Sequence, residues 1–504
     1  METTKKIPES SFFHFIMKEK ANRAYLLIAL SGTLIEFIVF KLLYPFPDFF
    51  SDSYSYIYAA QAHLDVSIWP IGYSKFLAVF HVLTHSDTTL IAFQYFFLEL
   101  SALWFFFSIL YFFSPGRIAT NLIFAFLFFN PLFLYISNYV NSDPLFAALS
   151  LLWFTQLLWI IHRPAWYQVF IHAVLLFLCF TIRNNSYYYP FVGLVAFLLS
   201  RQRTGIKLAG VGLPLLLIIP FVIHTRNAAY KMTGTKQFSL FTGWQLSNNA
   251  LYMYDDISVD PDDLSSVSSR ELDTLAKKFY QRIKPDFHEY LGEYVGNFFI
   301  RQSQSPLKQY LLNHYHIQDE YSNVVAWGKA SAVFNEYGSQ VIRQNPVAYA
   351  RSYMVLNAKN YFVPPLEKLG IYNLGTDNIW PAGVSWFDYE SPKVSSVSKK
   401  AQGYILYVFP ALWLVLNLYL VVCGVSILVK KKYKQANPDV NKSILLAGCF
   451  FVANFFFCIA ATIIVFRYEF MPLIICFASS MLAMEFMDKK VMKPLAVNLK
   501  PSHA

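Results

Sequence analysis

Long apolar runs constrain this 504-residue chain more than any other feature of its sequence. Such a run needs about 20 residues to cross the roughly 30 Å hydrocarbon core of a bilayer as a helix. A helix also satisfies its own backbone hydrogen bonds, which lipid cannot do. We therefore predict an all-α, polytopic transmembrane helix bundle with about ten spans, near residues 24–43, 89–113, 118–137, 144–161, 166–182, 187–200, 206–224, 403–429, 443–466 and 469–487.

The composition agrees with a membrane protein and argues against a nucleic-acid partner. Hydrophobic residues make up 56% of the chain and charged residues only 14%. The net charge is +10, but the lysines and arginines form short clusters between apolar runs, without the aromatic platform of a polar nucleic-acid-binding domain. We expect membrane lipids, and not nucleic acid, to surround this chain.

The basic clusters predict the side of the membrane on which each loop lies. Lysine and arginine favour the cytoplasmic side of short loops, and all clusters share one side if the N-terminus is cytoplasmic. The C-terminus is then cytoplasmic as well, and the segments 44–88 and about 225–402 are external. The clusters are Lys5, Lys6, Lys18, Lys20 and Arg23; Arg117; Arg163; Arg201, Arg203 and Lys207; Lys430, Lys431, Lys432 and Lys434; and Lys489 with Lys490.

These boundaries divide the chain into three parts. Residues 1–224 form an N-terminal transmembrane block, whose first external loop spans 44–88. Residues 225–402 are polar and contain helix-like stretches, so we expect an external, mostly helical domain with a small core of its own. Residues 403–504 form a C-terminal transmembrane block.

Ionisable residues near the membrane are candidates for function, because they are costly there unless solvated or paired. Each candidate also has an ordinary structural explanation. Asp143 precedes a proline, a pattern typical of a helix N-cap, and an arginine or lysine at a helix end can serve as an interfacial anchor. The candidates on the external side are Asp48, Asp52, Lys75, Asp143, Arg183 and Arg467.

Acids and cations on the same face favour one kind of chemistry. An alcohol or amine that attacks a sugar carbon and expels a lipid phosphate needs a carboxylate to take its proton and cations to stabilise the departing charge. The phosphate lies at headgroup depth, so the cations must project from helix ends. Arg183, Arg467 and Lys75 meet that requirement.

Four short motifs occur in order on the external side: "SDSYSY" at 51–56, "WPIGYSKF" at 69–76, "NSDPLF" at 141–146 and "RYEFMP" at 467–472. Together they resemble the GT-C class of polytopic glycosyltransferases, which includes protein O-mannosyltransferases and lipid A aminoarabinose transferases. The resemblance covers the N-terminal half well and the last spans loosely. It implies an inverting transfer of sugar from a polyprenyl-phosphate donor to a glycan, lipid or protein acceptor, in a bacterial inner (plasma) membrane.

The same resemblance assigns roles to the acids. Asp52 would be the general base that acts on the acceptor, with Asp48 as the alternative. Asp143 would orient the acceptor or a divalent metal ion. Many relatives have glutamate at that second position, so a metal requirement stays open and no other cofactor is implied.

By the same resemblance, Lys75, Arg183 and Arg467 would hold the donor phosphate. Tyr54 and His63 would line the site. Aromatic residues are also common at membrane interfaces without any catalytic role, which is the simpler explanation for this last pair.

Two other functions are compatible with the sequence. A transporter or flippase of lipid-linked saccharides would place ionisable groups near the membrane midplane, where we expect almost none in this chain. A receptor or scaffold would use the spans only as an anchor, for which ten helices are many.

Overall fold

Helices make up the regular structure of this chain. The computed structural model describes residues 11–283, 296–434 and 437–487, and within these ranges it contains no sheet. The only extended pairings there are two isolated bridges, Asp48 with Tyr139 and Asn378 with Lys393. Both predicted cytoplasmic termini, including the basic residues 5, 6, 489 and 490, lie outside the described residues.

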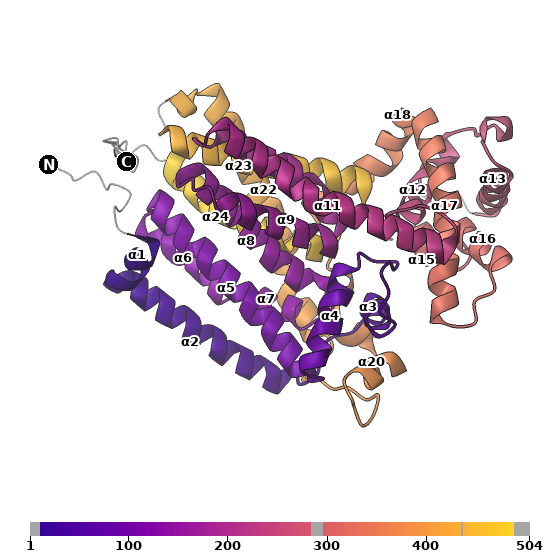
Figure 1. Cartoon of the computed structure of the whole chain (residues 1–504), viewed down its shortest axis with the longest axis horizontal. Helices are drawn as coiled ribbons and strands as arrows, with labels where there is room; N and C mark the ends of the chain where they lie inside the picture. Colours follow the sequence, from indigo (N-terminus) through magenta and orange to yellow (C-terminus); the bar gives the residue numbers. More distant parts are fainter. Residues whose placement is uncertain (1–10, 284–295, 435–436, 488–504) are drawn as a thin grey trace.

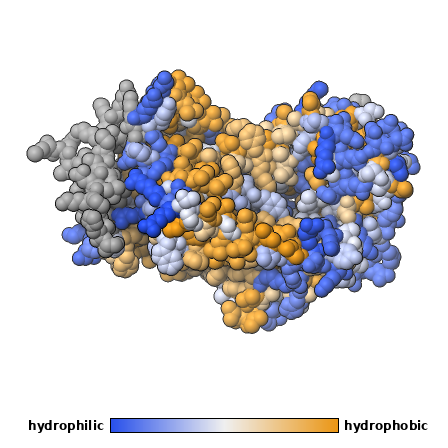
Figure 2. All heavy atoms as spheres, turned by 45° about the horizontal axis from the view of Figure 1, so that its top comes forward, coloured by the Kyte–Doolittle hydropathy of each residue, from blue (hydrophilic) through white to orange (hydrophobic). Residues whose placement is uncertain are grey.

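Among the described residues, eight helical stretches are long and apolar enough to cross a membrane. They indicate an integral membrane protein, as the sequence predicts. Figure 2 shows a broad hydrophobic band between two hydrophilic ends of the molecule. The stretches are α2 (Lys20–Leu43), α5 (Asp87–Phe113), α6 with α7 (Arg117–Ser137), α8 (Ser142–His162), α11 (Thr204–Thr233), α21 with α22 (Ala401–Val429), α23 (Pro438–Ala461) and η8 with α24 (Phe466–Met487).

Two of the ten predicted spans fold as shorter helices. α9 (Gln168–Ile182) has 15 residues and α10 (Tyr189–Leu199) has 11, so neither reaches the roughly 30 Å of a hydrocarbon core at about 1.5 Å per residue. The helix breaks between them because Arg183 has an extended backbone and a 3₁₀ turn, η1 (Asn184–Tyr188), follows it. This break places Arg183 beside the start of α8.

Two acids depart from the prediction that almost no ionisable groups lie near the membrane midplane. Glu36 lies inside α2 and Glu99 lies inside α5, where its side chain is buried. The two carboxyl groups are close enough to interact electrostatically. A single acid hardly lowers the mean hydropathy of a long apolar run. Glu36 and Glu99 are also isolated in sequence, so a search for clusters of charged residues does not identify them.

Two large hydrophobic cores organise the helices, and a third, minor cluster is formed by Val66, Ile68, Ala229, Leu240 and Val324. The larger core joins the helices of the bundle, and the smaller one lies between Trp244 and Tyr353. In Figure 1 the helices of the smaller core lie at one end of the bundle, and α11 reaches toward them. We call this group the polar unit. Its helices are α12 (Thr242–Leu251), α13 (Val267–Tyr280), α15 (Phe298–Arg301), α16 (Pro306–His314), α17 (Glu320–Gln344) and α18 (Pro346–Tyr349).

The chain after the polar unit returns to the bundle. Tyr361, Tyr372 and Trp386 are buried in the larger core. The elements of this stretch are α19 (Val355–Phe362), two 3₁₀ turns, η5 (Glu367–Gly370) and η6 (Tyr372–Gly375), and α20 (Pro381–Trp386). The predicted external segment 225–402 therefore contributes to both cores.

Candidate functional site

Helix ends at one end of the bundle bring the predicted acids and arginines together. Asp52 is the second residue of α3 (Ser51–Gln61), and Asp143 is the second residue of α8. Arg183 directly follows α9, and Arg467 lies in η8 just before α24. The four side chains come from distant parts of the sequence, so the cluster depends on the folded bundle.

Arg467 joins the two acids. Its Nη1 lies 3.1 Å from Oδ2 of Asp143, and its Nη2 lies 3.4 Å from Oδ2 of Asp52. Arg183 pairs with the other carboxylate oxygen of Asp143. The side chains of Arg467 and Asp143 are only 6% and 7% exposed, so these ion pairs are almost shielded from water. Breaking such a pair would leave a buried charge without compensation.

Asp143 is not the N-cap of α8, because Asn141 occupies that position. The Oδ1 atom of Asn141 accepts a hydrogen bond from the backbone N–H of Ser142. The amide of Asn141 donates to Oδ2 of Asp143 at 2.6 Å. The N-cap alternative is therefore wrong, and the carboxylate of Asp143 is used by the two arginines and this amide.

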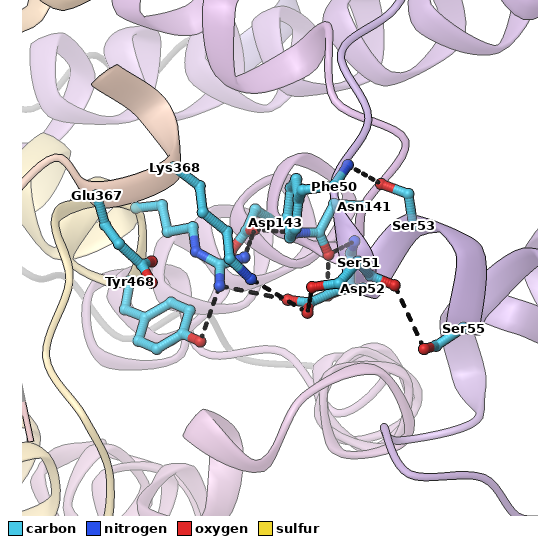
Figure 3. Close-up of polar contacts among 12 residues, drawn as sticks. Phe50, Ser51, Asp52, Ser53, Ser55, Asn141, Asp143, Glu367, Lys368 and Tyr468 are labelled. Atoms are coloured by element: carbon cyan, nitrogen blue, oxygen red, sulfur yellow. Dashed lines mark hydrogen bonds and ion pairs between the residues drawn. The ribbon is translucent and has the colours of Figure 1, made fainter. Parts of the chain in front are cut away.

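Lys368 is a third cation of the cluster, and the sequence did not predict it. Its Nζ lies 3.2 Å from Oδ1 of Asp52, and both side chains are 12% exposed. The two residues are 316 positions apart in the chain. Figure 3 shows Lys368 and Asp52 pointing toward each other, with Asp143 beside them. No local pattern identifies this lysine, since "EKLG" at 367–370 resembles many other polar stretches.

The cluster contains more positive than negative charge. Three cations, Arg183, Arg467 and Lys368, pair with two carboxylates, those of Asp52 and Asp143. A third carboxylate, that of Glu367, also acts on Arg467, but it is compensated by its own ion pair with Arg301. An excess of one positive charge in a nearly buried position is costly for the protein alone. An anionic ligand would compensate it.

Aromatic rings enclose the cations. The Nζ of Lys368 and the Cζ of Arg467 lie 4.5 Å and 4.9 Å from the ring centre of Phe50, and the Cζ of Arg183 lies 4.4 Å from that of Tyr468. Such cation–π contacts favour the charged form of each side chain. A small pocket of about 10 Å³, enough for about one water molecule, adjoins the cluster and is lined by Phe50, Ile136, Tyr139, Asp143, Lys368, Leu369 and Arg467.

Asp52 is held as a carboxylate at neutral pH. Burial alone would raise its pKa, but the positive charges of Lys368 and Arg467 outweigh burial and hold the pKa below its ordinary value. In this arrangement Asp52 is a proton acceptor whose basicity is reduced by its own partners.

Asp48 has a different environment and makes no ion pair with any described residue. Burial raises the pKa of Asp48 to about 7, because hydrogen bonds from the backbone of Asn373 and the side chain of Gln402 offset the loss of water only in part. The backbone N–H of Asn373 donates to Oδ1 of Asp48 at 2.8 Å. Asp48 thus binds a neighbouring segment of chain and does not face the three cations.

Three further predicted site residues lie outside the cluster. The Nζ of Lys75 lies 2.8 Å from Asp65, and both side chains are about half exposed. Tyr54 accepts a hydrogen bond from the backbone N–H of Trp380 and stacks on its ring. His63 is exposed in the turn after α3, with a φ of 51°.

The structure also finds a hydroxyl pair that the sequence analysis missed. The hydroxyl groups of Tyr56 and Ser142 form a hydrogen bond of 3.0 Å in the buried region between α3 and α8. It is therefore Tyr56, and not Tyr54, that points toward the segment bearing Asp143.

The chain has no match among protein-family models, curated proteins or solved structures.

The cluster does not fit a divalent metal ion. Hard cations require several available oxygen ligands, whereas both carboxylates already pair with arginine or lysine. Three fixed positive charges would also repel a metal. No group of three or more His, Cys, Asp or Glu side chains suited to a metal occurs within the described ranges of the chain.

Proposed function

We propose that this chain is a glycosyltransferase that moves a sugar from a polyprenyl-phosphate donor to a hydroxyl or amine acceptor at the external face of the membrane. The observation that carries the proposal is the buried cluster around Arg467, with its one excess positive charge, at the end of a membrane bundle. An anionic lipid headgroup is the natural ligand for such a position. A GT-C-like arrangement of the bundle in a bacterial inner membrane, with α9 and α10 as short helices that enter the membrane without crossing it, belongs to the same proposal.

Arg183 and Arg467 would hold the phosphate of the donor. Guanidinium groups bind phosphate oxygens in pairs, and both groups are fixed at helix ends by Asp143. The adjoining pocket is small, so side chains around it would have to move for the phosphate and the first sugar ring to enter. Asp143 would position the two arginines.

Asp52 would act as the general base. The proton of the acceptor moves to its carboxylate while the acceptor oxygen or nitrogen forms a bond to C1 of the sugar. The bond between C1 and the phosphate oxygen breaks, and the electron pair leaves with the polyprenyl phosphate. Attack from the face opposite the phosphate inverts the configuration at C1, and the arginines stabilise the departing charge.

The proposal predicts a measurable change in cells. Without the gene, a polyprenyl-phosphate sugar should accumulate and one sugar should be missing from a surface glycan, lipid or protein, as measured by mass spectrometry. Complementation with Asp52→Asn should leave both changes in place, whereas the matched exposed variant Asp65→Asn should reverse them. Unchanged pools in cells without the gene would refute the proposal.

A flippase of lipid-linked saccharides is the second candidate, because Glu36 and Glu99 lie within spans. Buried acids inside a bundle are typical of proton-coupled transport. If this function holds, Glu99→Gln should stop movement of a fluorescent short-chain polyprenyl phosphate across proteoliposome membranes. If the enzyme function holds instead, sugar transfer should survive Glu99→Gln and fail in Asp52→Asn.

A further inference from the structure

The turn that carries Lys368 connects the bundle with the polar unit. It comprises η5 and η6, residues 367–375, and lies directly beside the segment that presents Arg467. The backbone N–H of Phe466 donates to the carbonyl of Pro365 at 2.9 Å, so the two segments are joined one residue before Arg467. Any displacement of this turn would therefore also displace residues of the cluster.

Side chains of the bundle hold the backbone of this turn in place. The hydroxyl of Tyr139 donates to the carbonyl of Lys368 at 2.8 Å, and Nε2 of Gln402 donates to the carbonyl of Leu369 at 2.9 Å. Asp48 accepts the backbone N–H of Asn373 at 2.8 Å. The backbone is thus anchored on three sides, and the side chain of Lys368 is the part that is free to change partner.

Non-glycine residues in this turn have left-handed backbone conformations. The φ angles of Glu367, Asn373 and Leu374 are 50°, 45° and 51°. Each such residue costs about 1 kcal/mol or more, and strain of this kind persists where surrounding contacts over-determine it. The three anchoring hydrogen bonds supply those contacts, and they fix the direction in which Lys368 leaves the backbone.

Adjacent residues of the turn pair with different parts of the molecule. Lys368 reaches Asp52, whereas Glu367 pairs with Arg301 of α15, in the polar unit, at 3.1 Å. Figure 3 shows the two side chains leaving the same turn. The site cation is therefore supplied by a segment that also contacts the polar unit.

Lys368 is the least firmly held cation of the cluster. Arg467 contacts two carboxylates, and Arg183 contacts Asp143 and the ring of Tyr468. Lys368, like Arg183, makes one carboxylate contact, at 3.2 Å, and one ring contact, with Phe50, but its charge is a single ammonium on a flexible four-carbon stem. It can exchange that contact for a phosphate oxygen without breaking a bidentate pair.

We propose that Lys368 exchanges partners during the reaction, from the carboxylate of Asp52 to the phosphate of the bound donor. The exchange frees Asp52 to accept the acceptor proton only once a donor is present, which protects the site against futile reaction. This inference rests on the proposed function. It adds a phosphate-binding residue, and an order of events, that the sequence did not predict.

Binding of a short isoprenoid phosphate tests the exchange. The protein in nanodiscs is titrated with farnesyl phosphate, with farnesol and with inorganic phosphate. We expect Lys368→Met to weaken binding of farnesyl phosphate about tenfold or more while farnesol binding is unchanged, and Lys368→Arg to recover most of the affinity. The matched control is Lys442→Met, since Lys442 pairs with Asp439 at 3.0 Å and contacts neither the cluster nor this turn.

The pH profile of sugar transfer separates this role from a purely structural one. The groups that face Asp52 are Lys368 and Arg467, with Asp143, Tyr56 and Tyr468 nearby. Removing the lysine charge should move the acidic limb of kcat/KM to higher pH, because Asp52 then binds its proton more readily. A merely structural defect would lower the rate without moving that limb.

The possible outcomes distinguish the two proposals. Wild-type affinity for farnesyl phosphate and an unmoved acidic limb in Lys368→Met would overturn the exchange and leave the transferase proposal intact. If the wild-type protein binds farnesyl phosphate no better than farnesol, both proposals fail. Thermal stability of each variant, measured in the same nanodiscs, identifies a variant that has not folded. If Lys368→Met does not fold, the affinity of Lys368→Arg for farnesyl phosphate and its pH profile test the exchange instead.

Discussion

Two ion-pair groups near the same end of the bundle have opposite characters. Arg467 with Asp52 and Asp143 is almost fully buried, whereas Lys75 with Asp65 is about half exposed. Surface pairs contribute little to stability, because water and salt screen them. A buried group with excess charge is costly, and function is the simplest reason for a protein to keep it.

The position of a cation in the sequence therefore does not determine its role. Lys75 lies only 23 residues after Asp52 in a family-like motif, yet it turns to Asp65. Lys368 lies in a stretch without any motif, yet it reaches Asp52. Four variants test how far the difference extends.

The largest effect is expected from Arg467→Ala. It leaves Asp52 and Asp143 short of positive charge in a buried position, so the free energy of unfolding should fall by about 3–5 kcal/mol. Sugar transfer should fall by more than about a hundredfold. Activity assays and thermal unfolding in detergent measure both quantities. Near-normal transfer in this variant would remove the cluster from the site.

Asp52→Asn should abolish transfer with a smaller loss of stability. An amide cannot accept the acceptor proton, and the loss of a general base costs about 10²–10⁴-fold in rate. The amide oxygen can still accept a hydrogen bond from Lys368. Affinity for farnesyl phosphate should therefore be kept or improved, as titration would show. Full turnover by Asp52→Asn would exclude the residue as the base.

Asp48→Asn should change the pH dependence of stability. Burial raises the pKa of Asp48 to about 7, so the folded protein holds this proton more tightly than the unfolded chain does. The stabilisation is complete below about pH 4 and is lost as the pH rises through 7. The stability of the variant relative to wild type should therefore rise between about pH 4 and pH 7. If the melting temperatures of the variant and of wild type change with pH in the same way across that range, this assignment is wrong.

The smallest effect is expected from Lys75→Ala. An exposed pair contributes less than about 1 kcal/mol, and transfer should stay within about twofold of wild type. A loss comparable to that of Arg467→Ala would mean that Lys75 binds the donor after all, as its motif predicts. Rate measurements on both variants under identical conditions decide between these outcomes.

Much of this arrangement could be predicted from the sequence. Apolar runs predict the long helices, and the sidedness of charge brings Asp52, Asp143, Arg183 and Arg467 to one end of the bundle. These four residues lie at or beside helix ends. A prediction of where each helix begins or ends therefore also predicts the approximate position of each side chain. The structure finds this same set together.

Other parts required the fold. Lys368 enters the cluster through a turn whose anchors, Tyr139 and Gln402, are 229 and 33 residues away from the carbonyls that they bind. Long-range pairings of this kind leave no periodic pattern in a single sequence. The lengths of α9 and α10 depend on the break at Arg183, and a hydropathy window averages across such breaks.

The central claim, that the buried cluster receives a lipid phosphate, is tested most directly by cryo-electron microscopy of the protein in nanodiscs with farnesyl phosphate. The account predicts phosphate density about 3 Å from Arg467 and Lys368, with the lysine ammonium displaced from Asp52. Phosphate density at the opposite, basic end of the bundle, with Lys368 still paired to Asp52, would contradict it.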